Sequence, residues 1–193
     1  MSLTTLDIKE PGLNILPPGV ERHVVNAGGL TGLQIFPDDE IEIINDEGNQ
    51  ICEIICFDKD GKSELAILNL KENSDKSFIK EILKKRDESS LATNFQLKKR
   101  NLDLNKSHSS ILFDEKTPSG EKVKLKSKDK CYVIFSAPQN DMLVSEQNPS
   151  GDLILFVKRA KIINDKELSI IPDPVFEPHY EKNIDRQTAI SFQ

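Results

Sequence analysis

Thiol and imidazole groups are the first side chains to consider for chemistry, because they serve as metal ligands and as nucleophiles. The chain of 193 residues has three cysteines and three histidines. Cys52 and Cys56 are four positions apart, and on an extended strand this spacing separates them by ~13 Å at ~3.3 Å per residue. They cannot hold one ion together there. No Cys, His or carboxylate stands at a recognised ligand spacing from any of the three histidines, His23, His108 and His179. We expect no metal site.

Motifs that mark a reaction centre are also missing from the sequence. There is no Gly-rich phosphate loop, no strained serine turn and no zinc-protease helix. Carboxylates gather at 38–40 and 46–47, where they fit acidic turns at strand ends, and the Gly and distal Glu of a calcium loop are absent. We therefore expect no catalytic residue in this chain.

One polar loop has the position and composition of a binding site. Residues 136–141 read Ser-Ala-Pro-Gln-Asn-Asp and follow a strong strand pattern, and loops of this kind often carry binding groups. The candidate ligand-binding residues are Ser136, Gln139 and Asp141, joined by His108 from the polar Lys-Ser-His-Ser-Ser segment. The alternative is an ordinary turn that ends the strand.

Composition limits the class of protein. Hydrophobic residues make up 37% of the chain, charged residues make up 30%, and Trp is absent, which predicts an aliphatic core under a charged surface. The formal net charge of -6 argues against a general affinity for nucleic acid. No window approaches the ~18 apolar residues of a membrane span, and no secretory leader is evident. Three cysteines in such a chain indicate buried, reduced thiols in the cytoplasm.

The elements that would carry these residues are mostly strands. Apolar runs at 41–44 and 51–57 flank a turn at 46–49 in which Gly48 can take a positive φ, so the stretch from Phe36 to Phe57 predicts a β-hairpin. Further strands are expected at 63–70, 111–113, 121–126, 131–137 and 153–160. The alternating lysines of 121–126 are typical of an edge strand.

Two helices interrupt this pattern. Residues 73–75 offer an N-cap, and the apolar spacing of Phe78, Ile79, Ile82 and Leu83 is helical. A weaker helix is predicted over 90–100, with Leu91 and Phe95 as its apolar side. The expected fold is α+β with β dominant: an antiparallel β-sandwich or open barrel with one or two inserted helices.

Proline and glycine divide the chain into regions. Residues 1–31 contain many breakers and predict an N-terminal arm with at most one short strand. Residues 32–163 form the expected β-rich accessory domain, and residues 164–187 read as a Pro-rich linker. Residues 188–193 begin a new alternating pattern, so we expect the start of a following domain and a chain that is part of a longer polypeptide.

Two segments, Asp39 to Gln50 and Cys131 to Asp141, resemble parts of a domain family of unknown function, the urea carboxylase-associated proteins. Asp39 to Gln50 is similar to the family's opening hairpin, and Cys131 to Asp141 is similar to its late strand and the Ser-Ala-Cys-Pro-Gln-Asp loop that follows. This chain runs directly from Ala137 to Pro138 where the family loop has a cysteine. The family's central His and Cys residues have no counterpart between Lys71 and Lys130, so the resemblance carries no metal or thiol chemistry to this chain.

A second resemblance extends over nearly the whole chain. Asn-Leu-Asp-Leu at 101–104, Leu-Phe-Asp at 112–114, Ser-Ala-Pro at 136–138 and the segments 152–160 and 171–174 occur in the order seen in one group of large bacterial proteins. The chain is similar to their N-terminal region, and these proteins carry a glycine cleavage T-protein-like aminomethyltransferase further on. That domain transfers a one-carbon unit to tetrahydrofolate, which implies tetrahydrofolate as a cofactor downstream and none in residues 1–193.

The resemblance implies a non-catalytic N-terminal accessory domain, active in packing, oligomerisation or small-molecule sensing. Its expected partners are the downstream domains of the same polypeptide, with a homo-oligomer as a further option and neither nucleic acid nor membrane. The full-length protein would be an aminomethyltransferase-like transferase. The alternative is a stand-alone small-molecule-binding protein or enzyme of the urea carboxylase-associated family, with a pocket between the hairpin and residues 136–141. The sequence leaves both open.

Overall fold

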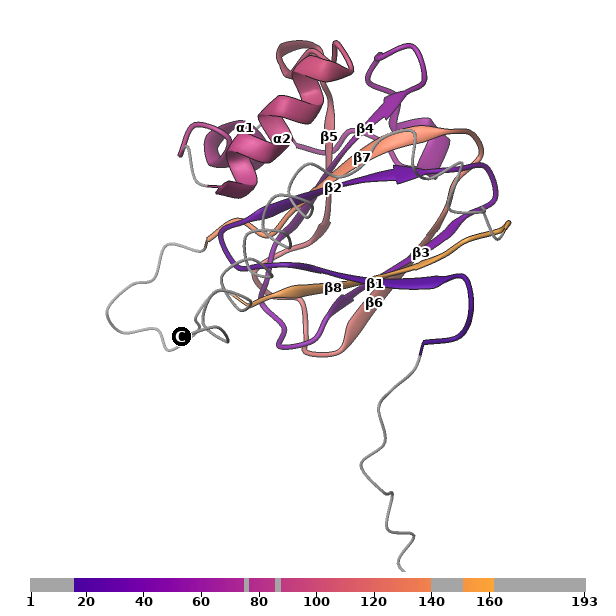
Figure 1. The fold of residues 1–193 in the computed structure, drawn as a ribbon. Coiled ribbons are helices and arrows are strands. Elements are labelled where there is room, and N and C mark those ends of the chain that lie inside the picture. Colours follow the sequence, from indigo (N-terminus) through magenta and orange to yellow (C-terminus); the bar gives the residue numbers. More distant parts are fainter. Residues whose placement is uncertain (1–15, 75–76, 86–87, 140–150, 162–193) are drawn as a thin grey trace, which may run out of the picture.

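Two four-stranded antiparallel sheets face each other in the computed structural model, which describes residues 16–74, 77–85, 88–139 and 151–161 (Figure 1). Sheet I has the strand order β1-β8-β3-β6, and sheet II has the order β2-β7-β4-β5. Most consecutive strands lie in opposite sheets, so the chain follows the course of a double-sheet jelly roll. The predicted β-dominant antiparallel sandwich with inserted helices is confirmed.

The strands of sheet I are β1 (Val20–Val25), β8 (Leu153–Lys158), β3 (Glu40–Asn45) and β6 (Glu121–Lys126), and those of sheet II are β2 (Leu30–Ile35), β7 (Cys131–Ser136), β4 (Cys52–Asp58) and β5 (Ser109–Phe113). Strand β8 pairs with β1 on one side and β3 on the other, so that Leu155 stands opposite both His23 and Ile43. Strand β6 lies at the edge of its sheet, as its lysines predicted.

The core between the sheets comes from the inward positions of the strands, because alternate side chains of a strand point to opposite faces. On β8, for example, Leu153, Leu155 and Val157 are fully buried, whereas Ile154 and Phe156 on the outer face are only partly buried. Burying an aliphatic side chain of this size contributes roughly 1.5–3 kcal/mol. A 3-10 helix, η1 (Leu65–Leu68), adds three more buried side chains to this core.

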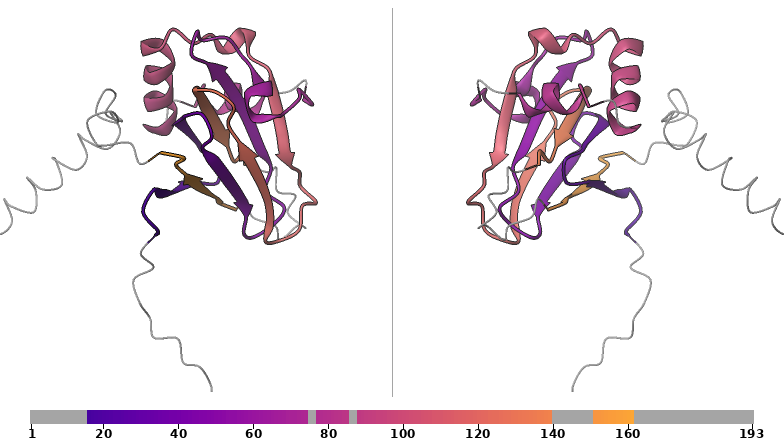
Figure 2. Two further views of the ribbon diagram at one scale, coloured as in Figure 1. Left: turned by 90° about the vertical axis from the view of Figure 1, so that its right-hand side faces the viewer. Right: turned by 90° about the vertical axis from the view of Figure 1, so that its left-hand side faces the viewer.

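The helices cover the outer face of sheet II (Figures 1 and 2). Helix α1 (Phe78–Ile82) begins at Ser77, whose side chain accepts a hydrogen bond from the Lys80 amide. Helix α2 (Glu88–Lys99) follows, and a short 3-10 helix, η2 (Leu104–Lys106), leads into β5. Ile79 and Ile82 of α1 join a second apolar cluster with the outward side chains of sheet II. Within the described residues, no helix has the length and apolar character to cross a membrane.

Three expectations about individual elements need correction or comment. The predicted hairpin of 36–57 is wrong, because β3 and β4 lie in different sheets and each is paired on both of its sides. The predicted strand at 63–70 is instead η1. The predicted N-terminal arm includes β1, the one short strand that was allowed for, which pairs with β8 along its length. Residues 1–15 of that arm and the predicted regions 164–187 and 188–193 lie outside the described residues.

The connection between β3 and β4, which crosses from one sheet to the other, is hydrogen-bonded within itself and to a neighbouring turn. The Asn45 side chain donates to the Gln50 carbonyl at 2.9 Å, and the Asn49 amide donates to the Thr117 carbonyl at 2.7 Å. Gly48 takes φ +81° at a point where a Cβ would lie 2.6 Å from the Ser119 amide nitrogen. The turn chemistry predicted for 46–49 is therefore present, and it joins two sheets instead of two neighbouring strands.

Candidate functional site

Three of the four predicted binding residues are described by the structure, and each lies in a different setting. Asp141 is outside the described residues. Ser136 ends β7 and is fully buried, whereas Gln139 is exposed three positions further on. His108 is exposed just before β5, where its Nδ1 lies 2.8 Å from Glu72 Oε1. Because β4 separates β5 from β7 in sheet II, the structure does not bring His108 next to Ser136.

Ser136 belongs to a buried polar cluster beneath α1. Its hydroxyl donates to Glu53 Oε2 at 3.4 Å, and the backbone amide of Ile79 donates to the same oxygen at 2.7 Å. Glu53 stands on β4, opposite Ser136 in the strand register, and is fully buried. The hydroxyls of Ser77 and Ser109 also interact with this carboxyl. A single carboxyl therefore connects β4, β7, β5 and the first turn of α1.

Burial controls the protonation of this carboxyl. Removal from water raises the pKa of Glu53 above its ordinary value, and the hydrogen bonds from Ile79, Ser109, Ser77 and Ser136 oppose this rise. The Ile79 amide and the Ser136 hydroxyl both bond Oε2, so we interpret Glu53 as an anchor that fixes the N-terminus of α1 to sheet II. Among the described residues, Oε1 of this carboxyl is buried without a hydrogen-bond partner. The sequence contained one signal for it: a lone acidic residue within the apolar run of β4.

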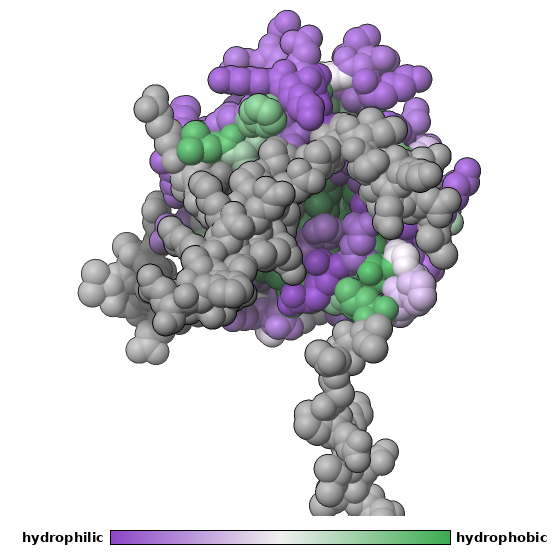
Figure 3. All heavy atoms as spheres, viewed as in Figure 1, coloured by the Kyte–Doolittle hydropathy of each residue, from purple (hydrophilic) through white to green (hydrophobic). Residues whose placement is uncertain are grey.

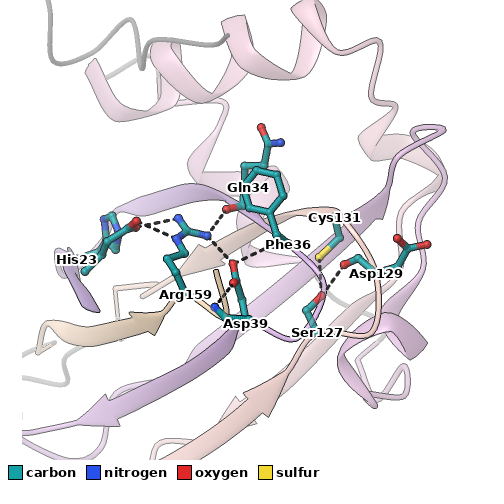
Figure 4. Close-up of polar contacts among 10 residues, drawn as sticks. His23, Gln34, Phe36, Asp39, Ser127, Asp129, Cys131 and Arg159 are labelled. Carbon is teal, nitrogen blue, oxygen red and sulfur yellow. Dashed lines mark hydrogen bonds and ion pairs between the residues drawn. The ribbon is translucent and has the colours of Figure 1, made fainter. Parts of the chain in front are cut away.

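A second cluster of buried polar side chains lies where the described chain enters and leaves the sandwich (Figure 4). Arg159, directly after β8, makes two hydrogen bonds to Glu21 of β1, from Nε to Oε1 and from Nη2 to Oε2, both at 2.8 Å. Its Nη1 donates to Asp39 Oδ2 at 2.7 Å and to the Gln34 carbonyl at 2.9 Å. We call Arg159, Glu21 and Asp39 the terminal clasp. It joins both sheets and the β2–β3 turn.

Backbone amides complete the clasp around Asp39. Its carboxylate accepts from the Phe36 amide at 3.0 Å and from the Ala160 amide at 2.9 Å, so both oxygens are bonded. Arg159 and Asp39 have side chains that are only 10% and 2% exposed. A buried charge pair of this kind contributes to stability mainly because removing one partner leaves the other charge uncompensated.

The clasp also alters the acidity of its members. Burial opposes ionisation of Glu21, but hydrogen bonds from His23 and Arg159, together with the Arg159 charge, outweigh this effect and lower the pKa of Glu21 to about 2. His23 Nε2 lies 3.1 Å from Glu21 Oε2. Sequence reasoning assigned Asp39 to an ordinary acidic turn and gave Arg159 no role, because the two are 120 residues apart in the chain.

The three cysteines face the core and are free thiols. Burial raises the pKa of the Cys52 thiol, and the hydrogen bond that pairs Cys56 with Cys131 raises the pKa of Cys56. Cys131 Sγ also lies 3.6 Å from Ser127 Oγ at the edge of the core (Figure 4). The predicted burial of the three thiols is confirmed, and Cys52 and Cys56 lie on one extended strand as expected.

A buried glutamine lies where the alternative function would need a pocket, between the β3–β4 connection and the residues after β7. Gln50 Nε2 donates to the Pro138 carbonyl at 2.8 Å and to the Ile51 carbonyl at 3.0 Å. Its Oε1 accepts from the Gly151 amide at 2.9 Å. This one side chain joins the connection directly to the segments that follow β7 and precede β8.

A surface hollow of about 600 Å³ lies on the outer face of sheet I. Its apolar side chains include Leu16, Val20 and Phe156, and its rim is charged, with Lys158 Nζ 3.6 Å from Glu40 Oε2 and Lys124 Nζ 3.3 Å from Glu42 Oε1. Across the part of the chain that the structure describes, His, Cys, Asp and Glu side chains do not gather in any group of three or more that could hold a metal ion.

Comparison with known proteins gives one relevant similarity. No protein-family model matches the chain. Over 185 residues, 96% of its length, the chain is 29% identical to the trimethylamine-oxide aldolase of Ruegeria pomeroyi. The matched segment is 23% of that protein's length, so the chain corresponds to one part of a much larger protein.

Proposed function

We propose that this chain is a non-catalytic accessory domain of a larger enzyme of one-carbon metabolism. The observation that carries the proposal is the match of 96% of the chain to only 23% of an aldolase. An accessory domain of this kind would pack against the other domains of its own polypeptide. We place the domain at residues 32–163, together with β1 from the preceding arm, followed by a linker at 164–187 and a further domain from 188.

The arrangement of the chain ends supports this role. The first and last described strands are neighbours, with Val20 opposite Lys158. The chain therefore enters and leaves the sandwich at one corner, where the terminal clasp links Glu21 to Arg159. A fold that is closed by its own ends in this way can be joined to other domains without opening its core.

The buried polar groups support a structural role as well. Glu53 is bonded to the α1 amide and to serine hydroxyls, Gln50 bonds the segments around it, and Asp39 has its carboxylate oxygens bonded within the clasp. Groups that are bonded within the fold in this way stabilise it.

We also propose a reaction class for the whole enzyme. The relative is named for trimethylamine oxide, which carries its methyl carbons on nitrogen. The aminomethyltransferase-like domain implied by the sequence resemblance also moves a carbon bound to nitrogen. Both support one-carbon transfer at a nitrogen atom, with tetrahydrofolate held by a downstream domain. The full-length protein would then be a transferase or aldolase of this class, with this chain as its accessory part.

The complete reading frame and a ligand-dependent melting experiment test the proposal together. We expect several hundred further residues after Gln193, and we expect tetrahydrofolate to raise the melting temperature of the full-length protein but not that of residues 1–193. A reading frame that ends at Gln193 would refute the accessory role. A melting shift of the isolated chain with tetrahydrofolate, trimethylamine oxide or an amino acid would instead favour the stand-alone binding protein.

A further inference from the structure

The outer side of α2 carries an unusual apolar surface. Leu91 and Phe95 are 56% and 54% exposed, and they are the large hydrophobic side chains that stand out in solvent among the described residues. They are one helical turn apart, and exposed Lys98 and Lys99 follow at the next turn on the same side. We call these four residues the α2 stripe. Figure 3 shows apolar surface next to hydrophilic side chains over the helices.

The opposite side of α2, which packs on sheet II, is largely polar. Ser90, Thr93 and Gln96 are buried there, and only Leu97 joins the apolar cluster beneath the helix. The Ser90 hydroxyl donates to the Ile82 carbonyl at the end of α1. A helix that packs only on its own domain normally buries its large apolar side chains and exposes its polar ones. This helix does the reverse, which indicates that its outer side has a partner.

The surroundings of the stripe are basic. Lys84 and Lys85 follow α1 and are exposed, and the carbonyl of the preceding Leu83 accepts from Asn94 Nδ2 at 3.2 Å, one residue before Phe95. These lysines add to the two in the stripe, although the whole chain has a formal net charge of -6. The charge that complements this surface is therefore negative.

The end of α2 lies close to the point where the chain leaves the sandwich. Arg100, directly after α2, donates from Nη2 to Gln34 Oε1 at 3.3 Å, and Arg159, directly after β8, donates from Nη1 to the backbone carbonyl of the same Gln34 at 2.9 Å. One residue of β2 thus connects the basic end of α2 with the chain exit. The described part of the chain therefore leaves the sandwich close to the end of α2.

We propose that the α2 stripe docks the downstream domain of the same polypeptide, in an apolar groove with an acidic rim. This inference rests on the proposed accessory function and adds its contact surface. Leu91 and Phe95 have the i, i+4 spacing with which helices insert side chains into such grooves, and the lysines pair with the rim. Because the two surfaces would belong to one polypeptide, their effective concentration is high, so a small contact area is sufficient for docking.

Hydrogen exchange of the α2 backbone amides in the full-length protein and in residues 1–193 tests the contact. We expect exchange of α2 to be at least about tenfold slower in the full-length protein, with α1 and the strands unchanged. The paired substitutions L91S and F95S in the full-length protein should return α2 to the rate of the isolated chain. They remove exposed side chains, so the sandwich should keep its melting temperature. F156S, on the outer face of sheet I, is the matched control and should leave α2 protected.

Charge-reversal variants test whether the lysines of the stripe are needed for docking. Reversal of both stripe lysines with K98E and K99E should lose most of the added protection, whereas K116E with K122E, on exposed residues away from α2, should not. Equal exchange of α2 in the full-length and isolated chains would overturn the docking proposal while leaving the accessory function in place. Protection that depends on protein concentration in residues 1–193 alone would also overturn it, because a second copy would then be the occupant. A reading frame without a downstream domain would refute both the docking proposal and the proposed accessory function.

Discussion

Replacing Arg159 with methionine is the most direct test of the terminal clasp. Methionine keeps a long unbranched side chain but removes the four hydrogen bonds that Arg159 makes to Glu21, Asp39 and the Gln34 carbonyl. Asp39 would then remain as a buried carboxylate with only the amides of Phe36 and Ala160 as donors. Breaking a buried pair by removing one partner costs about 3–5 kcal/mol. The remaining amide donors favour the lower end of this range.

The pH dependence of stability gives a second, independent value, the contribution of Glu21 to the free energy of unfolding. Hydrogen bonds from His23 and Arg159 outweigh the effect of burial and lower the pKa of Glu21 from 4.5 to about 2, so the contribution of Glu21 to stability is fully present above about pH 4.5 and is lost as the pH falls towards 2. For a fully buried group this change would correspond to roughly 3 kcal/mol. Because the Glu21 side chain is 33% exposed, solvent screening reduces the contribution to about 1–2 kcal/mol. R159M should lose the part of this contribution that comes from Arg159, while the hydrogen bond from His23 remains.

Urea unfolding followed by far-UV circular dichroism measures both quantities, since the chain has no Trp for fluorescence. We expect R159M to lower the free energy of unfolding by about 3 kcal/mol near neutral pH, and to flatten its decline between about pH 4.5 and 2.5. K158M is the matched control, because Lys158 is the adjacent residue and forms an exposed ion pair with Glu40 at 3.6 Å. The control should cost less than about 1 kcal/mol. Equal losses in the two variants would refute the assignment of the clasp.

Three further predictions concern the interior. Burial raises the pKa of Glu53, so the contribution of Glu53 to stability is fully present below about pH 4.5 and declines as the pH rises through the folded-state pKa. E53Q should therefore flatten the decline of the free energy of unfolding above pH 4.5. An unchanged pH slope of this free energy in urea titrations would contradict the prediction. A Cβ at Gly32 would lie 2.1 Å from Tyr132 Oη, so G32A should cost about 1–3 kcal/mol with partial recovery in the double variant with Y132F, as measured by thermal unfolding. The three buried cysteines should react slowly with a thiol reagent in the native protein and fully after unfolding, and rapid native labelling would show that the core opens.

Much of the fold was predictable from local patterns. The alternation and apolar runs of 41–44, 51–57, 131–137 and 153–160 identified four of the eight strands, and the lysines of 121–126 identified an edge strand. The thiols of Cys52 and Cys56 were correctly assigned to the interior. These features depend on residues within a few positions of one another, which is the range over which propensity and periodicity carry information.

The candidate site was less accessible to the same reasoning. Ser136 was selected because it starts a polar loop, but its role depends on Glu53, 83 residues earlier in the chain. The helix through Leu91 and Phe95 was predicted, but the sequence did not show that its polar side faces sheet II while Leu91 and Phe95 face solvent. Periodicity identifies the two sides of a helix and assumes that the apolar one is inside, which holds only when the domain has no other partner.

The sequence by itself determined where most of the described strands form, that the core is aliphatic, and that the turn at 46–49 has a glycine able to take a positive φ. Only the tertiary structure decided which strands are neighbours. The stretch from Phe36 to Phe57 satisfied every local rule for a hairpin, but β3 and β4 both have apolar side chains that must be buried between the sheets, and each obtains two strand partners by lying in a different sheet. The terminal clasp arises in the same way, because pairing of β1 with β8 brings Glu21 to Arg159. Such contacts are fixed by the packing of the whole sandwich and not by any segment of it.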